Sequence, residues 1–419
     1  MFTTQILFFL TFANSAFSTP TLPLTLRHLQ AIWRHGVMIL ITNLKIVHQN
    51  VFHIPTTFTT SLFWPYGWAQ LTQLGANQMT ELGRFFSQQY GDSFINRTYD
   101  RRGIYIKSSD SERALVSAQS FLDGFFSNNE LNWRPIPVHG SPQTRRDPLL
   151  KPSDFDCPIY EEEAKRLNSV LFNSLQRKYR DLFVFLGNVT GYGPNITLKQ
   201  VSGLNDINRE IAHQLLQPAW VQTRWPQFGG NTTLELVTEL KRIRRVSDFD
   251  KPELFRLRGG YLLGDWLRRA YQFVNGHLEG AEKMRLYSSH DGTLQSLLHA
   301  MGIADQQQIP YAACVIMEIL EDANHGHFVK MLYTYNGEVH VKKLRGCDEF
   351  CPLPTFIRLL NRHAIYNKDL LHEACGLEYC TRDCVKPKKK TNKKQNKKKS
   401  TKRFASKLVN SIELPEDDL

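Results

Sequence analysis

The sequence predicts an α/β protein with a mainly parallel sheet flanked by helices and an inserted helical cap lobe. Strand-length apolar runs alternate with amphipathic helical segments between Leu26 and Phe126, the order that gives parallel strands with helices on both faces. The pattern is then mostly helical from about 157 to 257, and another apolar run follows at Met284–Ser288. Two of the apolar runs lead into histidines, at the sheet edge where open α/β sheets bind ligands.

The first half of the sheet follows from the N-terminal segments. Leu26–Trp33 is the first predicted strand, and helical periodicity extends over Gly67–Tyr90. A short strand at Ile104–Ile106 leads into a second helix at Glu112–Phe126, whose small and apolar residues share one face. This order predicts parallel strands joined by crossover helices.

The middle of the chain is predicted to be a helical cap at 151–257, with loops near 187–194 and 217–230. A long helix over Leu254–Val274 and the strand Met284–Ser288 return the chain to the sheet. The α/β core is therefore discontinuous, formed by 23–150 and 258–385. The segments predicted to complete it are strands at 313–320, 328–334 and 339–344 and a helix at 353–363.

The charge is concentrated in the C-terminal tail, 386–419. The 419 residues carry a net charge of +12, but Lys386–Arg403 holds eleven Lys or Arg and no acid, which leaves about +1 (12 − 11) elsewhere. This balance excludes a basic nucleic-acid-binding fold. The tail is predicted to be disordered. It is either a solvated tail without a specific partner, a segment that binds anionic surfaces, or a nuclear signal.

Several features point to export. The apolar run Ile6–Phe17 is too short to span a bilayer and predicts a signal peptide over 1–18, with a buried first strand as the alternative. The sequence contains four glycosylation sequons: Asn96, Asn188, Asn195 and Asn231. The predicted location is secreted or lysosomal. No apolar run of about 20 residues lies near the C-terminus, so no transmembrane helix is predicted.

Cysteine usage supports an oxidising compartment. There are seven cysteines, and five of them fall within 347–384, which predicts disulfides near the C-terminus. Zinc binding is the competing interpretation, because Cys-x3-Cys occurs at Cys347/Cys351 and again at Cys380/Cys384. The odd number leaves one thiol free or paired between chains.

The strand ends carry the candidate chemistry. Arg34-His35-Gly36 follows the first strand, and His290-Asp291 follows Leu286-Tyr287-Ser288-Ser289. A neutral imidazole is a competent nucleophile, and arginine matches phosphate oxygens in geometry and charge. These pairs predict covalent phosphoryl transfer.

Four motifs in series resemble the histidine acid phosphatases, and most closely their prostatic and lysosomal branch. The motifs are Trp33-Arg34-His35-Gly36, Gln70–Gly75 with Glu81-Leu82-Gly83, Lys107–Arg113, and Tyr287–Asp291. The resemblance covers about Leu26 to Cys375. It implies a phosphoglycerate-mutase-like α/β domain with a helical cap. It also implies hydrolysis of phosphate monoesters through a phosphohistidine, without a metal or another cofactor.

The resemblance also assigns roles to residues. It implies that His35 is the nucleophile and that Asp291 protonates the leaving alcohol. The phosphate-binding residues would be Arg34, Arg113 and His290. It further implies the disulfides Cys157–Cys375 and Cys347–Cys351, whereas Cys314 matches a family cysteine whose usual partner is missing here. Homodimers are common in the resembling branch.

The sequence departs from the family motif Arg-His-Gly-x-Arg-x-Pro directly after Gly36. Met38 stands where the motif has its second arginine, and Leu40 stands at the proline. Loss of a buried cation would cost roughly 2–5 kcal/mol of transition-state binding. A second hypothesis is therefore an impaired pseudophosphatase that binds phosphorylated or anionic ligands. Part of 37–54 is either a retained intron or a gene-model error, or it is a genuine insertion, after which His53-Ile54-Pro55 could replace the end of the motif.

Overall fold

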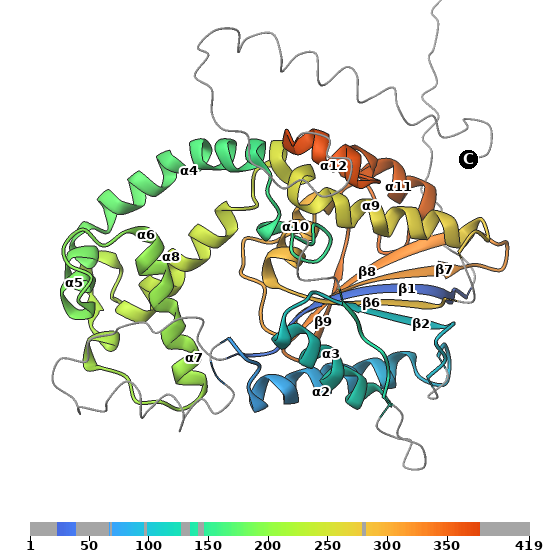
Figure 1. The fold of residues 1–419 in the computed structure, drawn as a ribbon, viewed down its shortest axis with the longest axis horizontal. Helices are drawn as coiled ribbons and strands as arrows, with labels where there is room; N and C mark the ends of the chain where they lie inside the picture. The colour runs from blue at the N-terminus through green and yellow to red at the C-terminus, as the bar shows by residue number, and fades with distance from the viewer. Residues whose placement is uncertain are drawn as a thin grey trace, which may run out of the picture. The chain divides into compact units, whose positions relative to one another are not determined.

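The computed structural model describes residues 23–38, 67, 69–95, 99–126, 135–140, 146–278 and 282–377. Within these residues a central sheet carries helices on both faces, and a helical lobe follows in the middle of the chain (Figure 1). Several predictions fall outside the described residues. They are the signal peptide 1–18, most of the atypical segment 37–63 including His53, the sequon at Asn96, Cys380, Cys384 and the tail 386–419.

The sheet has a parallel half and an antiparallel half. Its order is β10-β8-β7-β1-β6-β2-β3, with β9 paired to β8. The parallel strands are β1 (Thr25–Arg34), β6 (Met284–Ser289), β2 (Ile104–Ser108) and β3 (His139–Gly140). The antiparallel strands are β7 (Cys314–Glu321), β8 (His327–Tyr335), β9 (Glu338–Lys342) and β10 (Cys351–Pro352). The predicted α/β class is confirmed.

The antiparallel half follows from short connections between its strands. Strands β8 and β9 are joined by Asn336-Gly337, and both residues have positive φ, 51° and 80°. Such two-residue turns match the twist of a hairpin and force its strands to run in opposite directions. The predicted segments at 313–344 are therefore strands, but they pair by hairpins rather than through crossover helices.

Helices cover both faces of the sheet. On one face lie α2 (Gln73–Tyr90) and α3 (Glu112–Phe126), and on the other α9 (Phe255–Val274), α10 (Asp291–Met301), α11 (Leu353–Leu360) and α12 (Lys368–Cys375) (Figure 1). Alternation along β1 sends Ala31 and Trp33 into the α2–α3 core and Ile32 into the α9–α10 core. Both cores bury aromatic and aliphatic side chains.

The start of α2 corrects the predicted boundary. The sequence predicted a helix from Gly67, whereas α2 begins at Gln73. Thr72 is the N-cap, and its hydroxyl accepts a hydrogen bond from the Gly75 N–H at 3.1 Å. A threonine N-cap satisfies an N–H group that has no partner within the helix, so the helix begins directly after Thr72.

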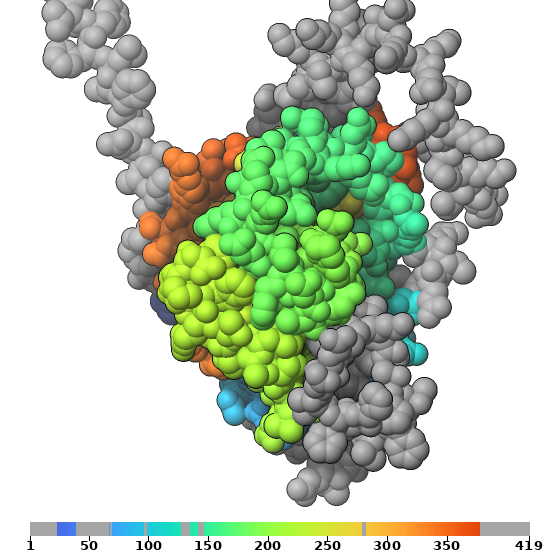
Figure 2. Space-filling view, turned by 90° about the vertical axis from the view of Figure 1, so that its left-hand side faces the viewer, coloured from blue at the N-terminus to red at the C-terminus, as the bar shows by residue number. Residues whose placement is uncertain are grey.

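The helical lobe has its own apolar core. It consists of α4 (Pro158–Lys178), α5 (Arg180–Thr190), α6 (Leu198–Gly203), α7 (Ile207–Ala212) and α8 (Thr233–Ser247), with the short pair β4 (Arg224–Trp225) and β5 (Asn231–Thr232). Its fully buried residues include Leu182, Leu186, Val201, Leu204 and Leu240. Figure 2 shows these helices, coloured green to yellow-green, over much of one face of the molecule.

Two disulfides are present. Cys157 directly before α4 is bonded to Cys375 at the end of α12, and Cys347 is bonded to Cys351. These are the pairs that the family resemblance implied. Because Cys347 and Cys351 are joined to each other, they are not zinc ligands, and that alternative is wrong for this pair. Cys314 is a buried free thiol in β7.

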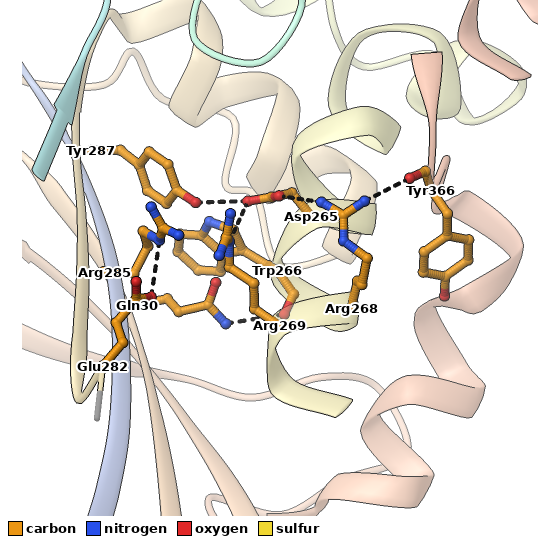
Figure 3. A network of polar contacts seen from close by, with 9 residues as sticks. All are labelled: Gln30, Asp265, Trp266, Arg268, Arg269, Glu282, Arg285, Tyr287 and Tyr366. Atoms are coloured by element: carbon orange, nitrogen blue, oxygen red, sulfur yellow. Dashed lines mark hydrogen bonds and ion pairs between the residues drawn. The ribbon is translucent and has the colours of Figure 1, made fainter. Parts of the chain in front are cut away.

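A network of buried charges joins α9 to the middle of the sheet (Figure 3). Asp265 accepts hydrogen bonds from Tyr287 Oη at 2.6 Å and Arg269 Nε at 3.0 Å, and it pairs with Arg268 at 2.7 Å. Gln30 of β1 donates to the Trp266 carbonyl at 3.0 Å. The network fixes α9 against β6, the strand that leads to His290.

Candidate active site

The two strand-end histidines lie side by side because their strands are neighbours. Strands β1 and β6 pair in parallel with Arg34 opposite Ser289, and the His35 N–H donates to the Ser289 carbonyl at 3.0 Å. The ring centroids of His35 and His290 are 5.4 Å apart. Residues more than 250 positions apart in sequence thus form one site, at the sheet edge that the sequence predicted.

The motif Gln70–Gly75, at the start of α2, supports the loop that carries His35. The Val37 carbonyl accepts hydrogen bonds from the Thr72 N–H at 3.0 Å and the Thr72 hydroxyl at 3.1 Å. Gly36 and Gly75 are in close contact, so a Cβ at Gly36 would lie 2.2 Å from the Gly75 oxygen. Only glycine permits this approach. The motif Gln70–Gly75 therefore holds the histidine loop.

Arg113, in the first turn of α3, connects the two histidines. Its Nε donates to His35 Nε2 at 3.3 Å, and its Nη2 lies 3.5 Å from His290 Nδ1. His35 Nδ1 lies 2.8 Å from the Gly36 carbonyl, to which it can only donate. The arrangement fixes the tautomer of His35, with a lone pair on Nε2, the nitrogen that faces Arg113.

Burial and nearby cations keep both imidazoles neutral. Burial lowers the pKa of His35 well below its usual value, and the charge of Arg34 lowers it further. Burial, together with Arg113 and Lys151, lowers the pKa of His290 to about 3. His290 Nε2 is 2.9 Å from the Ser109 hydroxyl. A neutral His35 retains its nucleophilic lone pair under acidic conditions.

Arg34 and Arg113 provide positive charge beside His35, and the charge of the Asp291 carboxylate acts on both. Neither forms an ion pair with an acidic side chain among the residues that the structure describes. The Arg34 guanidinium stacks on the Tyr311 ring, 3.7 Å from its centroid, and donates to the Ile309 carbonyl. Its buried Nε has no hydrogen-bond partner within the described part of the chain. Unpaired guanidinium groups beside a nucleophile suit a phosphoryl anion.

Asp291 begins α10, directly after His290, and its carboxylate is paired with an arginine. Its Oδ2 pairs with Arg245 Nε at 2.9 Å. Burial raises the pKa of Asp291, but the charges of Arg245 and Arg34 outweigh burial and hold the pKa well below its usual range. These charges therefore favour the ionised form of Asp291.

The structure adds three residues that the sequence did not reveal: Arg245, Arg209 and Tyr311. Arg209 of α7 donates from Nε to the Tyr311 hydroxyl at 2.8 Å, and the Tyr311 ring lies 5.9 Å from that of His35. The two arginines come from lobe helices that carry no recognisable motif, so only tertiary structure brings them here. Met38 is buried and pairs with Leu71 beside α2.

The described residues show no metal centre. They contain no group of three or more His, Cys, Asp or Glu side chains that could hold a metal ion. The groups around His35 are instead guanidinium, imidazole and hydroxyl donors. Such donors stabilise developing negative charge on phosphoryl oxygens.

The fold and the site define a histidine phosphatase, and comparison with known proteins agrees. A model of the histidine phosphatase superfamily (branch 2) matches residues 25–334. The chain belongs to this family. It is 33% identical to rat prostatic acid phosphatase over 310 residues, which cover 71% of this chain and 78% of the relative. It is 30% identical to the lysosomal acid phosphatase of Xenopus laevis over 358 residues, covering 80% and 76%.

Solved structures support the fold. The phytase of Hafnia alvei, solved with myo-inositol hexakis sulphate, matches with a TM-score of 0.63 at 14% identity, covering 84% of this chain and 98% of the phytase. A phytase from Citrobacter braakii matches with a TM-score of 0.60 at 15% identity, covering 81% and 98%. At this level of identity the likeness concerns the fold.

Proposed function

We propose that the protein is an acid phosphatase that hydrolyses phosphate monoesters through a phosphohistidine on His35. The observation that carries this proposal is the orientation of His35. Its Nδ1 donates to the Gly36 carbonyl, which leaves the lone pair on Nε2, where it accepts a hydrogen bond from Arg113 Nε at 3.3 Å. A phosphoryl group between Nε2 and the guanidinium of Arg113 would meet a nucleophile and positive charge together.

The reaction has two steps. In the first, His35 Nε2 forms a bond to phosphorus while the P–O bond to the alcohol breaks. Asp291, in its protonated form, gives its proton to the departing oxygen, because an alkoxide is a poor leaving group. In the second step, a water attacks the phosphohistidine and Asp291 accepts its proton, which releases phosphate and restores His35. Arg34, Arg113 and His290 bind the phosphoryl oxygens throughout.

The retained groups favour catalysis over binding alone, despite Met38. A protein that only binds phosphate has no need for a neutral imidazole with an oriented lone pair, and His35 has both. The cap also brings Arg209 to the Tyr311 hydroxyl, and its charge acts on Arg113. The cap therefore supplies positive charge near the site from Arg209, a residue outside the Arg-His-Gly motif.

Export and glycosylation fit this activity. Asn188, Asn195 and Asn231 are exposed on the helical lobe, as glycan attachment requires. The disulfides suit an oxidising compartment, and the relatives include lysosomal acid phosphatases. Among the described residues no helix is long and apolar enough to cross a membrane. We therefore propose that the protein is a secreted or lysosomal glycoprotein.

The test is hydrolysis of 4-nitrophenyl phosphate, whose phenolate leaves without a proton, by the secreted, folded protein at about pH 5. The variant His35→Ala is assayed beside it. We expect turnover by the wild-type protein and none by the variant. Equal activity in both, or no activity in a wild-type protein that binds phosphate, would contradict the proposal.

A further inference from the structure

The cap contributes an arginine directly to the carboxylate that serves as proton donor in the proposed reaction. Arg245 lies near the C-terminal end of α8, and its Nε donates to Asp291 Oδ2 at 2.9 Å. The pair joins the lobe to the first residue of α10. In the reaction proposed above, Arg245 would touch neither the phosphorus nor the nucleophile, so it would act through Asp291.

The protein provides a dedicated place for the Arg245 guanidinium. The group lies 4.9 Å from the centroid of the Phe249 ring, and Asp248 is 3.6 Å from its Nη1. Gly292 leaves the necessary space, because a Cβ there would lie 2.6 Å from Arg245 Nη2 and 2.7 Å from Ser153 Oγ. A residue larger than glycine would displace the guanidinium. This packing fixes the distance between Arg245 and Asp291.

Asp291 is surrounded mainly by cations. Arg245 and Lys241 approach from α8, Arg34 from β1, and Arg113 from α3. The neutral imidazoles of His35 and His290 lie beside it. Asp248 faces Arg245 rather than Asp291. It offsets only part of the positive charge that Arg245 presents to the Asp291 carboxylate. Arg245 is the cation that pairs with the carboxylate, so removing it changes the charge balance most.

We propose that Arg245 is a positioning residue that sets the pH range over which Asp291 can protonate the leaving alcohol. This inference rests on the proposed phosphatase activity. Because Arg245 favours the ionised carboxylate, the protonated donor forms only at low pH. The cap thereby restricts hydrolysis of alkyl phosphates to acidic conditions. An aryl phosphate whose phenolate leaves without a proton escapes this restriction.

The experiment compares kcat/KM across pH for 2-glycerophosphate and 4-nitrophenyl phosphate in Arg245→Met. Removal of an adjacent cation raises a carboxyl pKa by about 1 to 3 units. We therefore expect the basic limb of the 2-glycerophosphate profile to move up by roughly one to two pH units. The 4-nitrophenyl phosphate profile should remain within a few tenths of a unit. Gly292→Ala should shift the first profile in the same direction by a smaller amount.

Two control variants separate this role from a general effect of charge. Arg244→Met removes the neighbouring positive charge from the same helix, and it should leave both profiles in place. Arg245→Lys keeps a cation and should restore most of the wild-type profile. A limb that stays in place in Arg245→Met, or that moves equally for both substrates, would overturn the inference.

A direct titration keeps the inference testable if Arg245→Met is inactive. Carbon-13 NMR of labelled aspartate, with Asp291→Asn for assignment, reports the pKa of Asp291 in the folded protein. We expect a higher pKa in Arg245→Met than in the wild type, and an unchanged pKa would overturn the inference. A wild-type protein without any phosphatase activity would instead contradict the proposed function, while the titration would still test Arg245.

Discussion

The site around His35 and the network around Asp265 both contain buried or half-buried arginines, but these arginines have different partners in the two regions. Around Asp265, each guanidinium meets an acid: Arg268 and Arg269 share its carboxylate, and Arg285 pairs with Glu282 at 3.0 Å (Figure 3). Around His35, Arg34 and Arg113 meet imidazole, ring and carbonyl groups instead. In the first arrangement every cation has an acidic partner, whereas in the second Arg34 and Arg113 have none as a direct ion pair among the described residues.

The difference shows how this protein separates stability from function. A buried ion pair with all its partners in place is costly to break, because the remaining charge is left without compensation. Cations that outnumber the carboxylates near them repel one another, and a bound anion relieves that repulsion. Mutations in the two regions should therefore have opposite effects on stability and activity.

Asp265→Asn should give the largest effect on stability. The change leaves Arg269 and the Tyr287 hydroxyl without their carboxylate, and breaking a buried pair costs about 3–5 kcal/mol. Chemical denaturation would measure the loss of unfolding free energy. We expect the folded fraction to retain most of its kcat, since the hydrogen bonds of the Asp265 carboxylate within the described residues go to Arg268, Arg269 and Tyr287. A loss below 1 kcal/mol would show that the network is not the structural element described here.

Arg113→Met should give the reverse result. Removing one preorganised donor to a developing oxyanion lowers kcat by about 10²–10³. Unfolding free energy should stay the same or rise, because the variant lacks a half-buried cation that forms no ion pair with an acidic side chain among the described residues. Kinetics with 4-nitrophenyl phosphate and denaturation of the same preparation test both halves. A destabilised variant with normal kcat would contradict the claim that Arg113 serves activity and not stability.

Met38→Arg should raise kcat/KM, because it restores the second arginine of the family motif. An added charge-assisted hydrogen bond is worth roughly 1.5 kcal/mol, or about tenfold in kcat/KM. Met38→Lys serves as the control for charge without a planar guanidinium, and we expect a smaller gain from it. If Met38→Arg folds and brings no gain, position 38 no longer faces the phosphoryl group in this chain.

The smallest effect concerns stability at acidic pH. The folded-state pKa of His290 is lowered to about 3 from an ordinary value of 6.5. Above pH 6.5 this costs nothing, and as pH falls from 6.5 toward 3 the unfolded state binds the proton first, so stability is lost. His290→Asn should therefore lose less stability between pH 6.5 and 5 than the wild type, by on the order of 1 kcal/mol. Identical losses would contradict the buried neutral state of His290.

Local sequence pattern was sufficient for the parallel strands and their histidines. His35 and His290 follow short apolar runs that predict buried strands, and pairing of β1 with β6 then brings them together. The start of α2 was placed six residues too early, because helical periodicity continues through the segment before the Thr72 cap. The hairpins of β7–β9 were not predicted, although Asn336-Gly337 was a usable signal.

Arg245 could not be predicted from sequence. It is one of several basic residues near the end of α8, and Arg242 and Arg244 beside it resemble it in every local respect. Its contact with Asp291 depends on how the helical lobe packs against the start of α10, which is a tertiary property. The same holds for Arg209 and Tyr311, which lie more than 100 positions apart in the chain.

The most direct test of the account is to trap the phosphoenzyme. Protein incubated briefly with a radiolabelled phosphate monoester and quenched in alkali, in which phosphohistidine survives, is digested and sequenced by mass spectrometry. The account predicts one phosphate on His35, lost on acid treatment and absent in His35→Ala. A label on another residue, or turnover by His35→Ala at the wild-type rate, would contradict it.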